Sequence, residues 1–237
     1  MKKKSILSLL PAYCIILSVL LLVTALGSKA VTVASENSAV KHQNVIVIDA
    51  GHGGVDGGAT SCTGVLESQL NLEIAMRLND LMHLLGLQTK MVRTTDESVY
   101  TEGESIAAKK VSDLKRRVEI VNNTENALLI SIHQNYFSDQ RYWGAQVFYA
   151  KTNGSKELAT KMQTQLISNM NAGSKRQPKS ASGVYLMNKI NTPGVLVECG
   201  FLSNPQEEAK LRSKDYQLQL CSVIASCCSD YLYHNIA

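Results

Sequence analysis

Short apolar runs alternate with longer stretches of helical spacing along this chain. Residues 45–48 are four consecutive β-branched side chains, VIVI, and the run ends at Asp49. A short continuous apolar run of this kind is typical of a strand buried on both faces of a parallel sheet. In residues 68–86, SQLNLEIAMRLNDLMHLLG, apolar side chains recur at helical spacing until Gly86 supplies a stop. The pattern therefore predicts a buried strand at 45–49, a glycine-rich connection and then a helix.

The same alternation continues along the chain and predicts the fold class. Strands that alternate with helices indicate an α/β protein with a single domain and a mainly parallel sheet. Residues 96–113 are polar and long for a connection in such a fold, so we expect a functional excursion or a mobile loop there. We expect further strands at 89–94, 127–137, 144–150, 184–187 and 195–198, helices at 113–124, 156–170 and 216–233, and a basic loop at 174–182.

The first 30 residues look like an export signal. Lys2, Lys3 and Lys4 form a positive start, and the mostly apolar residues 6–26 are followed by small residues where cleavage can occur. The apolar stretch is also about long enough to span a bilayer uncut, which would leave the rest of the chain outside the cytoplasm. We therefore expect residues 1–30 to be a signal peptide or a membrane anchor, in preference to a buried soluble helix, and 31–43 to be a linker.

The net charge of +4 does not indicate a nucleic-acid-binding protein. The chain has 24 lysine and arginine residues against 20 aspartate and glutamate residues, and four of the lysines lie in residues 1–30, which contain no acid. The remaining chain is therefore neutral. A neutral domain has no electrostatic reason to bind the phosphates of DNA or RNA, so we expect no nucleic-acid partner.

The cysteines do not form a recognisable framework. One of the six, Cys14, lies in the apolar leader, and the other five are irregularly spaced without a paired Cys-x-x-Cys zinc motif. An odd number in an exported chain argues against a disulfide scaffold, although one bridge among the five is open. We expect Cys199 and Cys221 to pack in the core.

Three predicted strands end near side chains that can bind a metal or move a proton: His52, His133 and Glu198. Glu67 follows the glycine-rich connection that carries His52, at the start of the first helix. Because ligands in open α/β sheets sit at the carboxyl ends of strands, these four side chains can converge. Two histidines and one carboxylate, with a fourth position left open, form a known hydrolytic zinc site. A further carboxylate can then transfer protons during hydrolysis.

Simpler interpretations stay open for each of these residues taken alone. A single histidine after a strand is more often a hydrogen-bonded loop residue than a metal ligand, and spacing alone leaves the two interpretations about equal. Asp49 and Asp56 are competing carboxylates, and we expect Asp49 to orient His52 as a hydrogen-bond acceptor. We assign no role to the remaining histidines, His42, His83 and His234.

Four motifs together resemble the zinc-dependent N-acetylmuramoyl-L-alanine amidases of bacterial cell walls. They are IDAGHGGVDGGA, Glu67 before a long helix, SIHQN and VLVECGFLSNPQEEAKL, and they occur in the family's order between about residues 45 and 233. The resemblance implies a twisted sheet flanked by helices and one Zn²⁺ per chain, bound by His52, Glu67 and His133. By the same resemblance, Glu198 is the catalytic carboxylate.

The segment 96–113, with KKVSDLKRRVEIVN overlapping its end, is similar to the germination-specific amidases of spore-forming bacteria. This similarity implies an exported envelope enzyme, in the intermembrane space of the forespore, that trims stem peptides of cortex peptidoglycan on the way to muramic δ-lactam. We recognise no wall-binding module beside the catalytic amidase domain, 44–237. We therefore expect an exported partner, a lipoprotein or a scaffold, to dock on an exposed face such as 96–113.

Three functions of different classes follow from these observations. The first is hydrolysis of the amide bond between N-acetylmuramic acid and L-alanine of peptidoglycan stem peptides. The second is another zinc-dependent peptidoglycan hydrolase, a carboxypeptidase or a deacetylase. The third is a zinc-binding or wall-binding protein without catalysis. We expect the first, because all four chemical residues are present. Contact with a membrane would come from the N-terminal segment, if it stays uncleaved.

Overall fold

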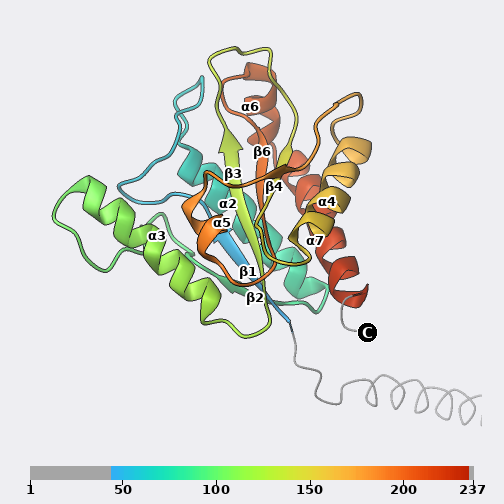
Figure 1. Cartoon of the computed structure of the whole chain (residues 1–237). Coiled ribbons are helices and arrows are strands. Elements are labelled where there is room, and N and C mark those ends of the chain that lie inside the picture. The colour runs from blue at the N-terminus through green and yellow to red at the C-terminus, as the bar shows by residue number, and fades with distance from the viewer. Residues whose placement is uncertain (1–43, 235–237) are drawn as a thin grey trace, which may run out of the picture. The chain divides into compact units, whose positions relative to one another are not determined.

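The computed structural model describes residues 44–234, so the expected leader and linker, and His42, lie outside the described residues. In this range the chain forms one six-stranded sheet with the strand order β2-β1-β3-β6-β4-β5 (Figure 1). β1, β2, β3 and β6 are parallel, whereas β4 is antiparallel to β6 and pairs in parallel with β5. The strands are β1 (Val45–Ala50), β2 (Gln88–Met91), β3 (Ala127–Asn135), β4 (Gln146–Tyr149), β5 (Lys179–Ser180) and β6 (Gly194–Phe201).

Helices pack on both faces of the sheet, and each face has its own apolar core (Figure 1). One face is covered by α2 (Glu67–Leu84), α4 (Ser155–Asn169) and α7 (Lys214–His234). The other face is covered by α3 (Ile106–Asn122) and α5 (Tyr185–Lys189). The prediction of an α/β fold with a mostly parallel sheet flanked by helices is therefore confirmed.

The central strands are apolar on both faces because both faces are covered. In β1, Ile46 and Ile48 belong to the larger core and Val47 to the smaller one, and all three are fully buried. This arrangement explains why the strand reads as a continuous β-branched run rather than as an alternating pattern. Toward the carboxyl ends of the central strands, polar side chains such as Asp49 and His133 follow on the face with the smaller core.

Several elements differ from the sequence-based expectation. Residues 106–113, which we expected to belong to an excursion or a mobile loop, are helical and form the start of α3. The helix can begin at Ile106 because Ser105 Oγ accepts a hydrogen bond from the Ala108 backbone N–H. Residues 184–187 were predicted as a strand, but α5 begins at Tyr185. A short apolar run does not distinguish a strand from one buried helical turn, and its apolar side chains pack in the smaller core. Two further short elements were not predicted: β5 and α6 (Pro205–Leu211).

The five cysteines within the described residues are all free. Cys199 and Cys221 are fully buried in the larger core, as predicted, whereas Cys62 is exposed. Burial raises the pKa of the Cys221 thiol to about 12, so this side chain behaves as a small apolar group. Between residues 44 and 234, we find no helix with the length and hydrophobicity that crossing a bilayer requires.

Candidate active site

Two buried arginines fix the loop that carries His52. Arg93 donates from Nε to the Ala50 carbonyl at 2.9 Å and from Nη2 to the Gly51 carbonyl at 3.1 Å. Arg117 donates from Nη2 to the carbonyl of His52 itself at 2.6 Å. His52 has a φ of 61°, a conformation that non-glycine residues rarely adopt. The arginines therefore hold the backbone of a strained turn directly after β1.

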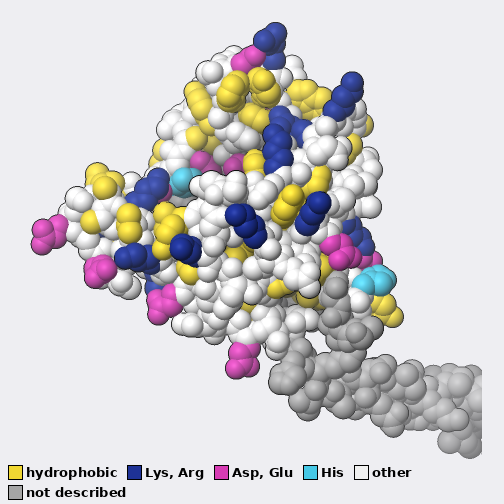
Figure 2. Space-filling view, viewed as in Figure 1, with side chains coloured by type: hydrophobic (Ala, Val, Ile, Leu, Met, Phe, Trp, Pro, Cys, Tyr) yellow, Lys and Arg dark blue, Asp and Glu magenta, His cyan; other side chains and the backbone are white. Residues whose placement is uncertain are grey.

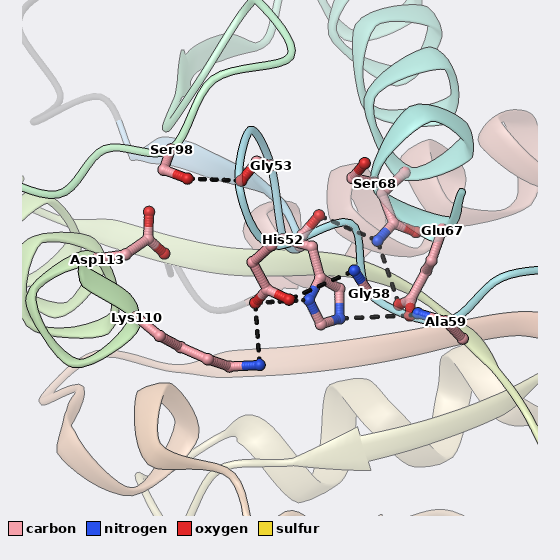
Figure 3. A network of polar contacts seen from close by, with 12 residues as sticks. His52, Gly53, Gly58, Ala59, Glu67, Ser68, Ser98, Lys110 and Asp113 are labelled. Atoms are coloured by element: carbon pink, nitrogen blue, oxygen red, sulfur yellow. Dashed lines mark hydrogen bonds and ion pairs between the residues drawn. The ribbon is translucent and has the colours of Figure 1, made fainter. Parts of the chain in front are cut away.

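His52, Glu67 and His133 converge on one point at the carboxyl end of the sheet. His52 Nε2 lies 3.3 Å from Glu67 Oε2, and His133 Nδ1 lies 3.0 Å from Glu67 Oε1. The potential ligand atoms of the three side chains all lie within 4.8 Å of one another. Figure 3 shows the imidazole of His52 directed toward Glu67, which projects from the first turn of α2. This donor set, two imidazoles and a carboxylate, suits a divalent ion such as Zn²⁺.

Glu67 is buried and is held as a carboxylate by several donors. Its Oε2 accepts a hydrogen bond from the Ala59 backbone N–H at 3.0 Å, and its Oε1 accepts one from the Gln134 backbone N–H at 3.1 Å. Burial alone would raise the pKa of Glu67, but the hydrogen bonds and charges of His133 and His52 lower it far below the usual range. The carboxylate is therefore ionised at neutral pH, as a metal ligand must be.

The second ring nitrogen of His52 binds Asp56, not Asp49. His52 Nδ1 lies 3.0 Å from Asp56 Oδ2, which also forms an ion pair with Lys110 at 3.0 Å (Figure 3). A carboxylate on the far nitrogen is a common way to fix the orientation of a metal-binding imidazole. The expectation that Asp49 orients His52 is therefore wrong.

Asp49 belongs instead to a buried ion pair beneath the site. Its carboxylate accepts hydrogen bonds from Arg117 Nη1 at 2.5 Å and from Ser131 Oγ at 2.7 Å. Because Asp49 lies within β1, its side chain is directed by the pleat of the sheet to the face covered by α3, where Arg117 lies. Asp49 thus anchors the arginine that holds the His52 carbonyl.

Glu198 lies beside the cluster of possible ligands. It is the register partner of His133 across the parallel strands β3 and β6, so the two side chains are on the same face of the sheet. Its Oε2 atom is buried and has no hydrogen-bond partner within the described residues. Burial raises the pKa of Glu198 to about 7. A carboxyl group with a free oxygen and a pKa near neutrality is suited to accept and return a proton.

A cavity of about 90 Å³ adjoins these side chains on the face with the smaller core. His52 and His133 form part of its lining, and Leu186 and Leu196 contribute an apolar wall. The structure thus brings together all four residues selected from the sequence. The sequence reasoning missed Arg93 and Arg117, because a charged side chain on a predicted helix or near a loop is normally solvated.

Comparison with known proteins gives a consistent picture. A family model described as N-acetylmuramoyl-L-alanine amidase matches residues 46–228. The germination-specific N-acetylmuramoyl-L-alanine amidase of Bacillus subtilis is 38% identical over 182 residues, which cover 76% of this chain and 76% of that protein.

Two solved structures share the fold. The CwlD amidase from Clostridioides difficile, in complex with the GerS lipoprotein, is similar with a TM-score of 0.77 at 35% identity, covering 81% of this chain and 100% of that one. The catalytic domain of CwlV from Bacillus (Paenibacillus) polymyxa var. colistinus gives a TM-score of 0.68 at 27% identity, covering 81% of this chain and 99% of that one.

Proposed function

The chain belongs to the N-acetylmuramoyl-L-alanine amidase family, and from this premise we propose that it hydrolyses the amide bond between N-acetylmuramic acid and L-alanine of peptidoglycan stem peptides. The observation that carries the proposal is the position of Glu198. A half-buried glutamate, whose Oε2 atom is buried and unpartnered within the described residues, lies in register with His133, beside the three converging donors. Amide hydrolysis needs such a group next to an electrophilic centre.

We infer that His52, Glu67 and His133 hold one Zn²⁺. The inference is supported by three donor atoms of the types that zinc prefers, brought within 4.8 Å of one another by a loop, the start of a helix and a strand. When bound, zinc polarises a carbonyl group and lowers the pKa of water to about 7. Asp56 keeps the Nδ1 of His52 occupied, so that Nε2 faces the site.

Glu198 would carry the proton transfers of the reaction. In its ionised form its free oxygen accepts the proton of the attacking water, and it then donates this proton to the departing nitrogen of L-alanine. A pKa near 7 serves both steps, because the group can be ionised before attack and can release a proton afterwards. His52 and His133 would hold the ion and leave the proton transfers to Glu198.

Product analysis distinguishes the amidase from its alternatives. Purified, zinc-loaded protein is incubated with muropeptides, and the products are identified by mass spectrometry. An amidase releases the intact stem peptide with a free L-alanine amino group. Loss of a terminal amino acid would indicate a carboxypeptidase, and loss of an acetyl group would indicate a deacetylase. Binding of zinc or wall material without any product would indicate a non-catalytic protein.

We further propose that the protein acts at the cell envelope in spore formation. The name of the Bacillus subtilis relative, a germination-specific amidase, supports a role in germination. The role that we propose within it, making muramic δ-lactam in the cortex, is the one that the sequence resemblance implies. Residues 1–30 would export the protein, as a signal peptide or as an uncleaved anchor, to the intermembrane space of the forespore. N-terminal sequencing of the mature protein tests the cleavage, and a fluorescent fusion in sporulating cells tests the location.

An exported lipoprotein is the partner that we propose. The CwlD amidase was solved in complex with the GerS lipoprotein, which supports a partner of this class. In the segment 96–113 of this chain, Ile106 and Val111 are 70% and 52% exposed and offer an apolar contact. The same segment touches the loop of His52, because Ser98 Oγ donates to the Gly53 carbonyl at 2.5 Å. The segment is thus in contact with the loop that carries a proposed zinc ligand. A partner that binds only the zinc-loaded form would raise the apparent affinity of the protein for zinc.

A double variant with Ile106→Ser and Val111→Ser tests this docking surface without removing the start of α3. We expect it to lose activity and correct localisation in cells while the purified protein keeps its activity. Leu84→Ser is the matched control, since Leu84 is 83% exposed at the end of α2. Normal localisation and normal cellular activity of the double variant would count against a partner at 96–113.

A further inference from the structure

A groove of about 550 Å³, separate from the cavity that His52 and His133 line, is basic. None of the described residues that line it is acidic. Trp143 and Tyr142, which are 41% and 46% exposed, add aromatic surface to the same lining. Figure 2 shows lysine and arginine side chains next to hydrophobic ones in the upper half of this face. The basic residues of this basic groove are Arg141, Lys175, Arg176 and Lys179.

The basic groove is one strand away from Glu198. Gln146 lines the groove and is the register partner of Glu198 across the antiparallel strands β4 and β6. Directly opposed residues of antiparallel strands have Cβ atoms about 4.5–5.5 Å apart and point to the same face. Arg176 Nη1 in turn donates to Gln146 Oε1 at 3.3 Å. Arg176 thus contacts the residue that is paired in register with Glu198.

Arg176 is held rigidly and faces the groove. Its guanidinium lies 4.7 Å from the centre of the Phe201 ring, and its Nε donates to the Trp143 carbonyl at 2.9 Å. These contacts, with the hydrogen bond to Gln146, use two of the five N–H donors of the guanidinium. A guanidinium fixed in this way can offer its remaining donors to a carboxylate without losing further side-chain entropy.

The charge of the groove is also not neutralised from within. Arg141 is paired with Asp139 at 2.7 Å, and Arg176 is attracted electrostatically by Glu207. The structure gives no ion pair between Lys175, Lys179 or Arg176 and any acid of the described residues. Three cations around one groove attract anions. A groove of this volume is large enough for a peptide of several residues.

We propose that the basic groove binds free carboxylates of the acidic stem peptide, with Arg176 as the residue that recognises them. The proposal rests on the proposed amidase function, because it assigns the peptide side of that substrate to the groove. An extended peptide advances about 3.3–3.6 Å per residue, so a carboxylate one or two residues beyond the scissile amide reaches a site next to Glu198. The groove thereby makes the enzyme selective for an acidic leaving peptide.

Two muropeptides that differ only in charge test the proposal. One carries a stem tetrapeptide with its carboxylates free, and in the other the carboxylates of the second and third residues are amidated. For the zinc-loaded wild type we expect kcat/KM to be about tenfold higher for the acidic substrate, mainly through a lower KM. Arg176→Ala should abolish this preference, and Lys179→Ala should reduce it while the fold stays intact. Lys156→Ala, an exposed lysine on α4, should leave it unchanged.

Direct binding separates this proposal from the amidase assignment. The released acidic tetrapeptide and its amidated form are titrated calorimetrically into the wild type, Arg176→Ala and Arg176→Lys. Tighter binding of the acidic peptide that depends on Arg176 supports the groove, even if the wild type cleaves neither muropeptide and the amidase assignment fails. If an active wild type binds and cleaves the two forms equally, the groove proposal is overturned but the amidase assignment is not. If Trp143→Ala lowers kcat/KM equally for both substrates and Arg176→Ala keeps the wild-type kcat/KM, the groove binds sugars. This result would also overturn the proposal.

Discussion

His133 and Glu198 face each other in register on the adjacent parallel strands β3 and β6. One is a proposed metal ligand and the other is the proposed proton carrier. Adjacent strands lie about 4.8 Å apart, and their spacing is fixed by backbone hydrogen bonds. The relationship between the two functional groups is therefore set by the centre of the sheet and not by a loop. The register becomes irregular only beyond His133, between this residue and Asn135.

Gly51→Ala should displace His133. A Cβ atom at Gly51 would lie 2.2 Å from His133 Nε2, so the imidazole would have to move. We expect the variant to fold and to lose about 10²-fold in kcat/KM, because displacements of about 1 Å at a reacting site have effects of this size. Gly183→Ala is the matched control, since a Cβ there meets no atom within 4 Å. Equal kinetics for the two variants would show that the position of His133 does not matter.

Asp56→Asn should weaken metal binding by way of His52. The carboxylate of Asp56 is the partner of His52 Nδ1, and loss of such partners typically costs about 10–100-fold in metal affinity. Competition with a chromophoric chelator measures the zinc Kd of the purified variant. Lys110→Ala removes the ion pair of Asp56 but keeps its carboxylate, so we expect a smaller effect. An Asp56→Asn protein with wild-type zinc affinity would refute this role.

Zinc removal should lower the melting temperature of the wild type. An ion that binds only the folded state stabilises it by about 2.7 kcal/mol at a concentration of 100 times its Kd. We expect a chelator to reduce Tm and zinc to restore it. His133→Ala should bind no stoichiometric zinc, and its Tm should not respond to the chelator. His83→Ala, on the exposed side of α2, should respond as the wild type does. A zinc-dependent Tm in His133→Ala would contradict the ligand assignment.

Asp49 and Arg117 should make stability depend on pH. Burial alone would raise the pKa of Asp49, but Arg117 and the hydrogen bond from Ser131 lower it below the ordinary carboxyl value. Since the folded pKa lies below the unfolded one, the stabilisation is complete above the unfolded pKa of about 3.9 and is lost as pH falls through the folded pKa. Asp49→Asn leaves a buried guanidinium without this partner and should cost about 3 kcal/mol at pH 7.

Denaturant unfolding at pH 7 and at pH 3 measures both effects of this variant. The difference in stability between wild type and Asp49→Asn should shrink at the lower pH. Glu119→Gln is the control, because Glu119 forms an exposed ion pair with Arg116, which contributes little to stability. A constant difference between wild type and Asp49→Asn at the two pH values would contradict the lowered pKa.

Most of the sequence information about the candidate site lay in the residues at which the buried strands end. The run before His52 and the run before His133 identify adjacent parallel strands, and parallel strands bring their carboxyl ends together. Glu67 could be added because it begins the helix that follows the glycine-rich connection. The fold class and the candidate residues were therefore accessible from periodicity and residue type, whereas their assignment as a site and their separate roles came from the resemblance to the amidase family.

The supporting residues were not accessible in the same way. Arg117 is 2% exposed although it lies in a helix rich in charged residues, and no pattern marks which of its arginines is directed inward. The choice between Asp49 and Asp56 depends on a contact between distant segments, because Arg117 binds the Asp49 carboxylate and Asp56 lies 3.0 Å from His52 Nδ1. The helix at Tyr185 is a tertiary effect, since its short apolar run fits a strand equally well.

One measurement tests the central claim most directly. It is the rate at which zinc-loaded Glu198→Gln releases stem peptide from a muropeptide, with the metal content measured in the same sample. The claim is that Glu198 moves the protons and that the other three side chains hold the ion. The account predicts one zinc per chain, as in the wild type, and a rate lower by about 10²–10⁴-fold. A variant that carries its full zinc and releases the peptide at the wild-type rate would contradict it.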